Sequence, residues 1–328
     1  MCTSLAFTGS HPCFGRNLDL EESFGEQIVI TPRSFSLTFR RLPCQKNHYA
    51  IIGMAHVAGG VPLYAEAVNE KGLYMAGLNF PGNACYFPHA DDGATEAAPY
   101  ELIPWLLGQC ATIEETKDLL ERLRLLDEPF APGLPSAPLH WHLSDGHTSL
   151  VLESMADGLH IHTDPVGVLT NNPPFDFHLT NLRQYLNLTA ASPENRFHSA
   201  LSLSPFGQGM GSLGLPGDPS PVSRFVRAAF YKWNSPWAEE EAGRMTQCFH
   251  VLDGVAMVPG SVRTPEDKLD QTTYSCCICP GEAGVTYYYK TASNQRICAV
   301  RMAEHQMDQT ELAVFPLKTE QDICWHKE

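Results

Sequence analysis

The sequence predicts a globular α+β protein in which helices pack outside β-sheets. Strand-like and helical segments follow one another in the order strands, helices, strands, helices, strands, and this order favours helical layers packed against sheets. The composition agrees, because apolar residues make up 43% of the chain and charged residues only 18%, with 5 Trp, 11 Tyr and 16 Phe. This much apolar material is enough for a well-packed core and argues against disorder.

Short strand-like runs fill the first third of the chain. Each is rich in β-branched or aromatic residues and is closed by Gly, Pro or Asn. The runs span residues 2–8, 27–31, 49–55 and 73–79. Two helices are predicted next, an apolar one over 100–107 and one that begins at the capping box Thr112-Ile113-Glu114-Glu115. The residues that recur on one face of the second helix are Ile113, Thr116, Leu119, Leu120 and Leu123.

The middle of the chain predicts a β-meander, followed by helices and then by closing strands. Strand candidates at 139–143, 149–154 and 159–163 are joined by polar turns at Asp145-Gly146 and Asp157-Gly158. Helices are predicted over 175–186, 223–233 and 237–252, and the last strands over 273–279, 285–291 and 297–302.

Residues 202–221 are unusually rich in Gly and Pro. This composition is typical of a flexible linker between two domains. However, Phe206, Met210, Leu213 and Leu215 are too apolar for a solvated linker, so we favour a structured excursion from a single domain.

The charge balance excludes several classes of partner. The chain has 37 acidic and 22 basic residues, a net charge of -15, whereas binding to DNA or RNA requires a basic face. No segment approaches the roughly 18 apolar residues of a membrane span. The run Leu5-Ala6-Phe7 is too short for a signal peptide, and the first basic residue is Arg16. We therefore expect a cytoplasmic protein that binds neither nucleic acid nor membrane.

Cysteine and histidine offer two candidate metal sites, and both have a simpler interpretation. The 11 cysteines are dispersed and odd in number, which favours mostly reduced, buried thiols. The group Cys276-Cys277-Ile278-Cys279 lacks a second Cys pair or a His-x-x-x-His partner at zinc-finger spacing, so we favour buried strand thiols. The histidines that alternate along two strands are His140, His142, His160 and His162; solvent-facing positions are favoured over a metal cluster. We expect no metal and no organic cofactor.

Cys2 is a candidate nucleophile because of its position. Methionine aminopeptidases remove Met1 when the next side chain is small, and Cys qualifies. The new N-terminal residue would carry a thiol, which is a strong nucleophile once ionised, and an α-amine with a pKa near ~8, which accepts a proton near neutral pH. One residue would then supply both nucleophile and base.

Arg16 and Asp19 follow on a predicted strand end or turn, within Phe14-Gly15-Arg16-Asn17-Leu18-Asp19. An Arg can hold a thiolate, and an Asp can accept a hydrogen bond from the α-ammonium that forms after proton transfer. The alternative is a structural Arg–Asp pair at a hairpin.

Eight motifs together resemble the choloylglycine hydrolase family, which comprises conjugated bile salt hydrolases and penicillin V acylases. They run through the whole chain in the family's order. They are Met1-Cys2-Thr3, Phe14-Gly15-Arg16-Asn17-Leu18-Asp19, Asn69-Glu70-Lys71-Gly72-Leu73, Gly77-Leu78-Asn79-Phe80-Pro81, Gly167-Val168-Leu169-Thr170-Asn171, Gly214-Leu215-Pro216-Gly217-Asp218, Ser223-Arg224-Phe225 and Val255-Ala256-Met257.

The resemblance implies an N-terminal nucleophile hydrolase: one domain over 1–328, folded as a four-layer αββα sandwich. By this resemblance Cys2 is the nucleophile, Arg16, Asp19 and Arg224 orient and tune it, and Asn79 and Asn171 stabilise the oxyanion of the tetrahedral intermediate. Taken alone, Asn79 could close a strand and Asn171 could cap a turn. The excursion at 202–221 resembles the assembly loop of relatives that form homotetramers.

The resemblance also implies a substrate, a bile acid conjugated to glycine or taurine. Asn79 favours this branch, because penicillin acylases more often carry Tyr there. Cys2 would attack the amide carbonyl and form a thioester, which water then hydrolyses. Leu18, Ala58, Phe130 and Leu134 match pocket positions that would contact the steroid, although each could equally be core packing. The loop 127–138, with four prolines, departs from the relatives and leaves the preferred conjugate open.

Three other functions stay open. The same chemistry could act on penicillin V, an acyl-homoserine lactone or an N-acyl amino acid. The chain could instead be a non-catalytic family member that binds steroid acids as a sensor or carrier. The chain could also be a redox sensor that responds through the thiols of Cys276, Cys277 and Cys279.

Overall fold

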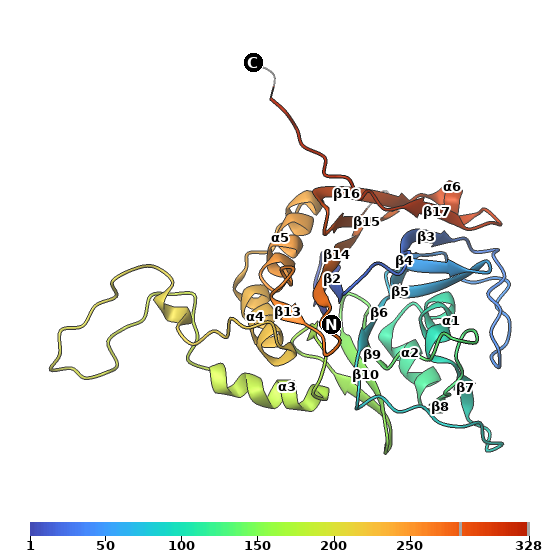
Figure 1. Cartoon of the computed structure of the whole chain (residues 1–328), viewed down its shortest axis with the longest axis horizontal. Helices are drawn as coiled ribbons and strands as arrows, with labels where there is room; N and C mark the ends of the chain where they lie inside the picture. The colour runs from blue at the N-terminus through green and yellow to red at the C-terminus, as the bar shows by residue number, and fades with distance from the viewer. Residues whose placement is uncertain (282–283, 327–328) are drawn as a thin grey trace.

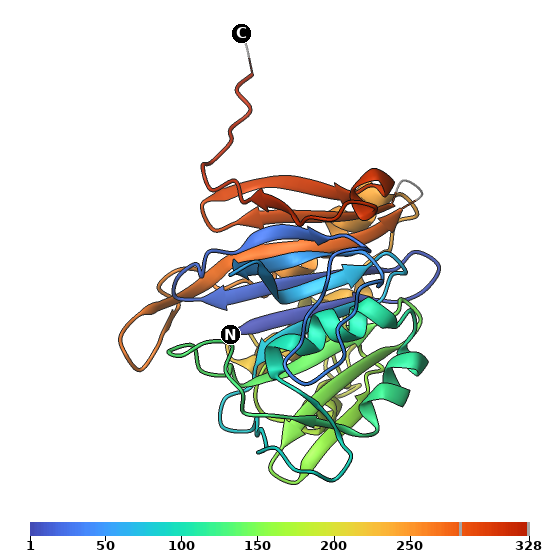
Figure 2. The same ribbon diagram turned by 90° about the vertical axis from the view of Figure 1, so that its right-hand side faces the viewer.

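The computed structural model describes residues 1–281 and 284–326. Two β-sheets stack face to face, and helices cover the outer face of each sheet (Figures 1 and 2). This arrangement confirms the predicted α+β class and the four-layer αββα sandwich.

The first sheet has seven strands in the described ranges. Its strand order is β12-β1-β2-β14-β15-β16, with β13 paired to β14, and all pairs are antiparallel. The strands are β1 (Cys2–Phe7), β2 (Cys13–Leu20), β12 (Val168–Leu169), β13 (Val262–Arg263), β14 (Leu269–Gly281), β15 (Gly284–Thr291) and β16 (Asn294–Met302). Strands from opposite ends of the chain are thus neighbours in one sheet.

The second sheet has the order β11-β10-β9-β6-β5-β4-β3-β17. Its strands are β3 (Gln27–Thr31), β4 (Ile51–Ala58), β5 (Val61–Asn69), β6 (Tyr74–Asn79), β9 (Leu139–Ser144), β10 (Ser149–Met155), β11 (Gly158–Thr163) and β17 (Ala313–Pro316). The predicted meander is confirmed as β9, β10 and β11. A separate parallel pair joins β7 (Thr95–Ala97) to β8 (Leu123–Leu125).

The helices form the two outer layers. The larger ones are α1 (Leu102–Gln109), α2 (Ile113–Leu120), α3 (Phe175–Leu182), α4 (Pro221–Asn234) and α5 (Glu241–Asp253), and α6 (Glu304–Met307) is a short one. Three 3-10 turns lie at Pro99–Glu101, Arg183–Tyr185 and Met210–Ser212. Helices α4 and α5 pack on β1, β2 and β14, while α1 packs on β4, β5 and β6. None of the helices in the described ranges has the length and apolar character to cross a bilayer.

Helix α2 begins where the capping box predicts, because the Thr112 hydroxyl accepts a 3.2 Å hydrogen bond from the Glu115 nitrogen. It ends at Leu120, so the prediction that Leu123 belongs to its apolar face is wrong. Leu123 begins β8 instead.

The sequence predicts Arg16 and Asp19 at a strand end or turn, and this is wrong for Arg16, which lies inside the eight-residue strand β2. Asp19 is the last residue but one of this strand, and the first seven residues are buried. The strand is covered by the second sheet on one face and by α5 on the other, so it shows no apolar/polar alternation that would mark it as a strand. Its buried polar side chains bond to both layers, Arg16 to Glu66 and Asn17 to the Leu252 carbonyl oxygen.

Cys13 and Cys279 form a disulfide bond between β2 and β14. The expectation of reduced thiols is wrong for this pair. Cys276 and Cys277 are free and buried in β14, as predicted for strand thiols.

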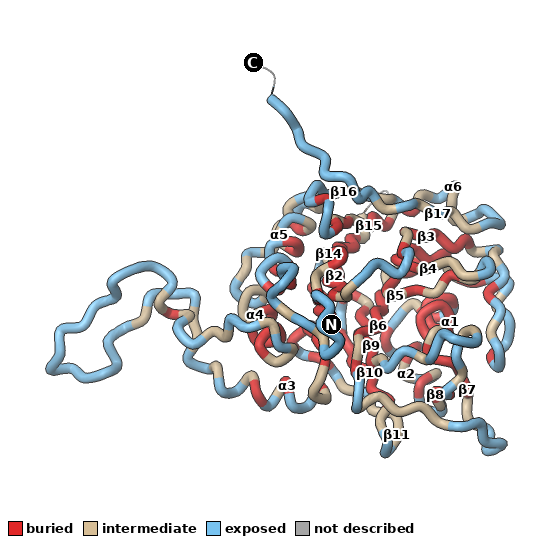
Figure 3. The backbone as a smooth tube through the Cα atoms, viewed as in Figure 1, coloured by how far each residue is buried: buried red, intermediate tan, exposed pale blue. Residues whose placement is uncertain are grey.

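The Gly/Pro-rich excursion is part of an arm that leaves the body between α3 and α4 (Figure 1). It exposes large apolar side chains: Leu186, Phe197, Phe206 and Leu213 are 65–92% exposed. Most of the arm is exposed (Figure 3), so these side chains give it an apolar surface.

Candidate active site

Cys2 lies at the start of β1, a strand flanked by β12 and β2. Its side chain is 2% exposed. Arg16, on the neighbouring strand, donates from Nη2 to the Cys2 sulfur at 3.2 Å. A guanidinium at this distance stabilises a thiolate relative to a thiol. The structure thus brings together the two residues that the sequence placed fourteen positions apart.

The main chain of Cys2 is held from the other side by Asn171 and Arg224. The Cys2 nitrogen donates to Asn171 Oδ1 at 2.9 Å. Arg224, on α4, donates from Nη2 to the same oxygen at 2.7 Å and from Nη1 to the Cys2 carbonyl oxygen. Arg224 is fully buried. Asn171 and Arg224 therefore fix the nitrogen that becomes the α-amine when Met1 is removed.

Asn79 is the last residue of β6 and is partly exposed. Its carbonyl oxygen accepts a 2.7 Å hydrogen bond from Asn171 Nδ2. The structure thereby links the two predicted oxyanion residues to each other and to Cys2.

Asp19 is buried beside this group, on the face of β2 that Arg224 approaches. Its Oδ1 accepts a 2.6 Å hydrogen bond from the Thr272 hydroxyl, and its Oδ2 lies 4.0 Å from Arg224 Nη1. Oδ2 has no hydrogen-bond partner among the described residues. Burial raises the pKa of Asp19, and Arg224 and Thr272 offset only part of that rise. Asp19 thus offers a buried, free acceptor oxygen.

Met1 extends the pairing of β1 with β2. The Asp19 nitrogen donates to the Met1 carbonyl at 2.8 Å, and the Met1 nitrogen donates to the Asp19 carbonyl and lies 3.6 Å from Asp270 Oδ2. With Met1 in place, the Cys2 nitrogen is an amide and cannot act as a base. The base function therefore depends on removal of Met1.

The four predicted pocket residues differ in their environment. Leu18 is buried and is the register partner of Cys2, so its side chain lies on the same face of the sheet. Ala58 is half-buried in the β4–β5 turn region. Phe130 packs edge-on against Tyr100 at 5.3 Å, and Leu134 is 52% exposed. The structure brings Leu18 to Cys2, and the pocket role of all four residues stays a prediction.

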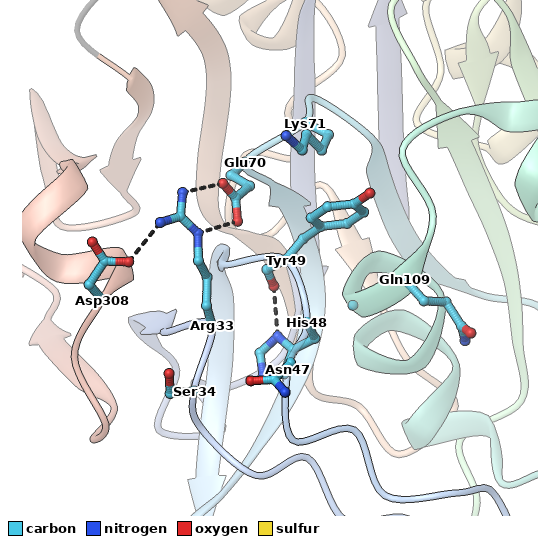
Figure 4. A pocket seen from close by; sticks show the side chains of 10 residues that line it. Arg33, Ser34, Asn47, His48, Tyr49, Glu70, Lys71, Gln109 and Asp308 are labelled. Atoms are coloured by element: carbon cyan, nitrogen blue, oxygen red, sulfur yellow. Dashed lines mark hydrogen bonds and ion pairs between the residues drawn. The ribbon is translucent and has the colours of Figure 1, made fainter.

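A separate cavity of about 770 Å³ lies at the far end of β5 (Figure 4). Its lining residues include Arg33, Tyr49, Glu70, Lys71 and Asp308. None of the predicted site residues lines it. Arg33 forms two hydrogen bonds with Glu70 there and one with Asp308.

The chain matches one protein-family model, described as linear amide C–N hydrolases of the choloylglycine hydrolase family, over residues 2–315. This match spans nearly the whole chain. The chain belongs to the choloylglycine hydrolase family. As a family member it is an amide hydrolase.

Curated relatives in this family are similar over nearly their full length. The chain is 44% identical to the bile salt hydrolase/transferase of Lactiplantibacillus plantarum over 98% of both chains. It is 38% identical to the bile salt hydrolase/transferase of Clostridium perfringens over 96% of both.

Solved structures of the family have the same fold. The C2A mutant of the conjugated bile acid hydrolase from Clostridium perfringens has a TM-score of 0.91 and 35% identity, with both chains fully covered. Penicillin V acylase from Agrobacterium tumefaciens has a TM-score of 0.76 at 20% identity, covering 97% of this chain and 92% of that one; this match speaks for the fold alone.

Two buried carboxylates of the site were missed by sequence reasoning. Glu66, on β5, accepts a 2.8 Å hydrogen bond from Arg16. Asp270, on β14, faces the N-terminus, and its Oδ1 has no hydrogen-bond partner within the described part of the chain. No sequence motif marks either residue. Sheet stacking brings Glu66 close to Arg16, and strand pairing brings Asp270 close to the N-terminus.

The histidine prediction is wrong for the pair on β9, because His140 and His142 are fully buried. His142 bonds to the hydroxyls of Ser4 and Ser149, each at 2.7 Å. They lie between the two sheets, so both faces of the strand are covered. In the described ranges, the one compact group of potential metal ligands is Cys13, Cys277 and Cys279, and two of these share the disulfide bond.

His140 belongs to a network that supports the loop carrying Asn171. Its Nδ1 lies 3.0 Å from Glu153 Oε1, and its Nε2 lies 3.1 Å from the Thr170 carbonyl oxygen. Glu153 also accepts from the Phe175 nitrogen at 3.1 Å. One carboxylate thereby anchors both ends of this loop.

We expect Glu153→Gln to lower the free energy of unfolding at neutral pH, and to lower it by less than half as much at pH 3. Burial alone would raise the pKa of Glu153, but hydrogen bonds from His140 and His162 lower it to about 2, from an ordinary value of 4.5. The ionised carboxylate therefore stabilises the fold above pH 4.5, and this stabilisation is lost as the pH falls toward 2. The difference corresponds to about 3 kcal/mol. Urea unfolding of both proteins at pH 7 and pH 3 measures it, and an equal stability gap at the two pH values would contradict this account.

Proposed function

We propose that this enzyme hydrolyses the amide bond of bile acids conjugated to glycine or taurine, with Cys2 as the nucleophile. The observation that carries the proposal is the Arg16 guanidinium on the Cys2 sulfur, in a site where Asn171 and Arg224 hold the Cys2 main chain. The names of relatives at 44% and 38% identity support bile salts as the substrate.

In the proposed reaction, Met1 has been removed and the Cys2 α-amine takes the thiol proton. The sulfur attacks the amide carbonyl carbon, and Asn79 and Asn171 donate hydrogen bonds to the developing oxyanion. The α-ammonium then gives its proton to the leaving nitrogen. Glycine or taurine departs, and the bile acid is held as a thioester of Cys2.

The same groups release the product. The α-amine, unprotonated again, takes a proton from water, and the resulting hydroxide attacks the thioester carbonyl. The carbon–sulfur bond breaks, the sulfur regains a proton from the α-ammonium, and the free bile acid leaves. In this proposal Asp19 accepts a hydrogen bond from the α-ammonium in both half-reactions. Arg224 supports this role, because it lies 4.0 Å from Asp19 Oδ2 and donates to the Cys2 carbonyl oxygen.

A panel of substrates tests the proposal. We expect glycocholate or taurocholate to be cleaved with a kcat/KM at least about tenfold above that for penicillin V, a difference of roughly 1.4 kcal/mol in transition-state binding. Release of glycine or taurine is measured with a primary-amine reagent. Cleavage of penicillin V or of an acyl-homoserine lactone without cleavage of either bile salt would keep the chemistry and overturn the substrate.

We also propose that residues 1–328 form one domain that assembles into a homo-oligomer, a homotetramer by resemblance. A single domain is supported by sheets that join both ends of the chain, as when β17 pairs with β3. Assembly is supported by the apolar arm, since exposed patches of this kind mark association surfaces. Sedimentation equilibrium of the purified protein gives the subunit number, and a monomer would overturn the assembly.

A further inference from the structure

Glu66 is a fully buried carboxylate on β5 that faces the first sheet. Its Oε2 accepts from Arg16 Nη1 at 2.8 Å and from the Tyr274 hydroxyl at 2.7 Å. Its Oε1 accepts from the Tyr287 hydroxyl, and the Cys276 sulfur lies 3.7 Å away. The groups that face it thus come from β2, β14 and β15, and each of them donates.

These donors remain protonated. Burial raises the pKa of Tyr274 and Tyr287 well above the ordinary value for tyrosine, and burial followed by the charge of Glu66 does the same for the Cys276 thiol. Burial would lower the pKa of Arg16, but Cys2, Tyr274 and Glu66 raise it. Arg16 is therefore the one fixed positive charge that touches Glu66, among the residues that the structure describes.

Arg16 divides its guanidinium between two partners. Nη1 points to Glu66, and Nη2 points to the Cys2 sulfur. Nη1 also donates to the Ala65 carbonyl oxygen at 2.7 Å, so two neighbouring residues of β5 anchor the guanidinium. The negative charge of Glu66 offsets part of the positive charge of Arg16. A more negative Glu66 therefore weakens the stabilisation that Arg16 gives to a thiolate.

We propose that Glu66 is a positioning residue that holds Arg16 against Cys2 and sets how strongly Arg16 stabilises the Cys2 thiolate, with Tyr274 and Tyr287 tuning the charge of Glu66. The inference rests on the proposed function only in taking Cys2 as the nucleophile. It adds a second carboxylate, on the opposite sheet from Asp19, to the control of the site.

Two substitutions should move the reactivity of Cys2 in opposite directions. Glu66→Gln removes the competing charge, so we expect the pH midpoint of Cys2 alkylation to fall by about one unit. Tyr287→Phe removes a donor to Glu66 and leaves more of its negative charge facing Arg16, so we expect the midpoint to rise by a few tenths of a unit. If Glu66 and Tyr287 did not act on the charge of Arg16, neither midpoint would move.

The readout is alkylation by iodoacetamide at a series of pH values, followed by mass spectrometry of the N-terminal peptide. The peptide separates Cys2 from the exposed Cys44 and Cys324. The acid limb of kcat/KM against pH is recorded as a second readout and should shift in the same directions. For Glu66→Gln, we also expect kcat to fall at least tenfold with a smaller change in KM, because Arg16 is held less firmly.

Glu70→Gln is the matched control. Glu70 pairs with Arg33 just past the end of the same strand (Figure 4), and neither residue bonds to Cys2 or Arg16 among the described residues, so its loss removes an Arg–Glu pair without touching the site. We expect no shift of the Cys2 midpoint in this variant.

Each outcome decides the inference. A lower midpoint in Glu66→Gln and a higher one in Tyr287→Phe, with an unchanged Glu70→Gln, support it. A higher midpoint in Glu66→Gln, a lower one in Tyr287→Phe, or unchanged midpoints in both overturn it. If Glu66→Gln does not fold, Tyr287→Phe decides alone: a rise supports the inference, and no change or a fall overturns it. Alkylation needs no bile salt, so a failure of the proposed substrate would leave this result intact.

Discussion

A Cys2→Ala variant should lose at least about a thousandfold in kcat on conjugated bile salts and keep its fold. The substitution removes the sulfur that attacks the carbonyl, and loss of a catalytic nucleophile costs several orders of magnitude. The side chain is small and sits in a well-filled core, so we expect a loss of only about 1–2 kcal/mol in the free energy of unfolding. Glycine release and urea unfolding measure the two effects.

Cys110→Ala provides the matched control for this prediction. Cys110 is also a buried free thiol, but it follows α1 on the outer side of the second sheet. This variant should keep the wild-type rate. Turnover by Cys2→Ala, or an equal loss in both variants, would remove Cys2 from the proposed mechanism.

Retention of Met1 should be nearly as damaging as loss of the thiol. If a lysine is inserted between Met1 and Cys2, methionine aminopeptidase no longer removes Met1, and the Cys2 nitrogen stays an amide that cannot accept a proton. General base catalysis contributes roughly 10²–10⁴-fold, so we expect a loss of that size. Intact mass and kcat, measured on the same sample, test it.

The control for this experiment restores the cysteine at the N-terminus. A cleavable leader that ends directly before Cys2 should give an inactive protein, and proteolytic removal of the leader should return the wild-type rate. An active enzyme with Met1 or the leader still attached would show that the α-amine is not the base.

Local signals in the sequence predicted part of the site. Arg16 and Asp19 were found because they lie three positions apart and close in sequence to the predicted strand that begins at Cys2. The antiparallel pairing of β1 with β2 brings Arg16 to the Cys2 sulfur. Arg224 and Asn171 come from distant elements and were found only through family motifs. Glu66 was missed because no spacing relates β5 to β2; only the stacking of the two sheets brings it to Arg16.

The errors in the fold have the same physical origin. The outer layers were predicted well, since one face of α2 is apolar and its cap is local. Strand β2, with Arg16, Asn17 and Asp19, was misassigned because burial on both faces removes the alternation that identifies a strand. His140 and His142 were placed in solvent for a related reason: alternation suggests an exposed face, but the second sheet is covered on both sides.

The pairing of Met1 with β2 also bears on when Met1 can be removed. Met1 is paired with Asp19 and lies beside Asp270 once the sheet has formed, so its removal is easiest while the N-terminus is still free of β2 and β14. We therefore expect Met1, whose removal the proposed mechanism requires, to be removed early in synthesis, before α4 brings Arg224 to Cys2. The N-terminal cysteine would then exist before Arg224 and Asp270, which complete its surroundings, have been made.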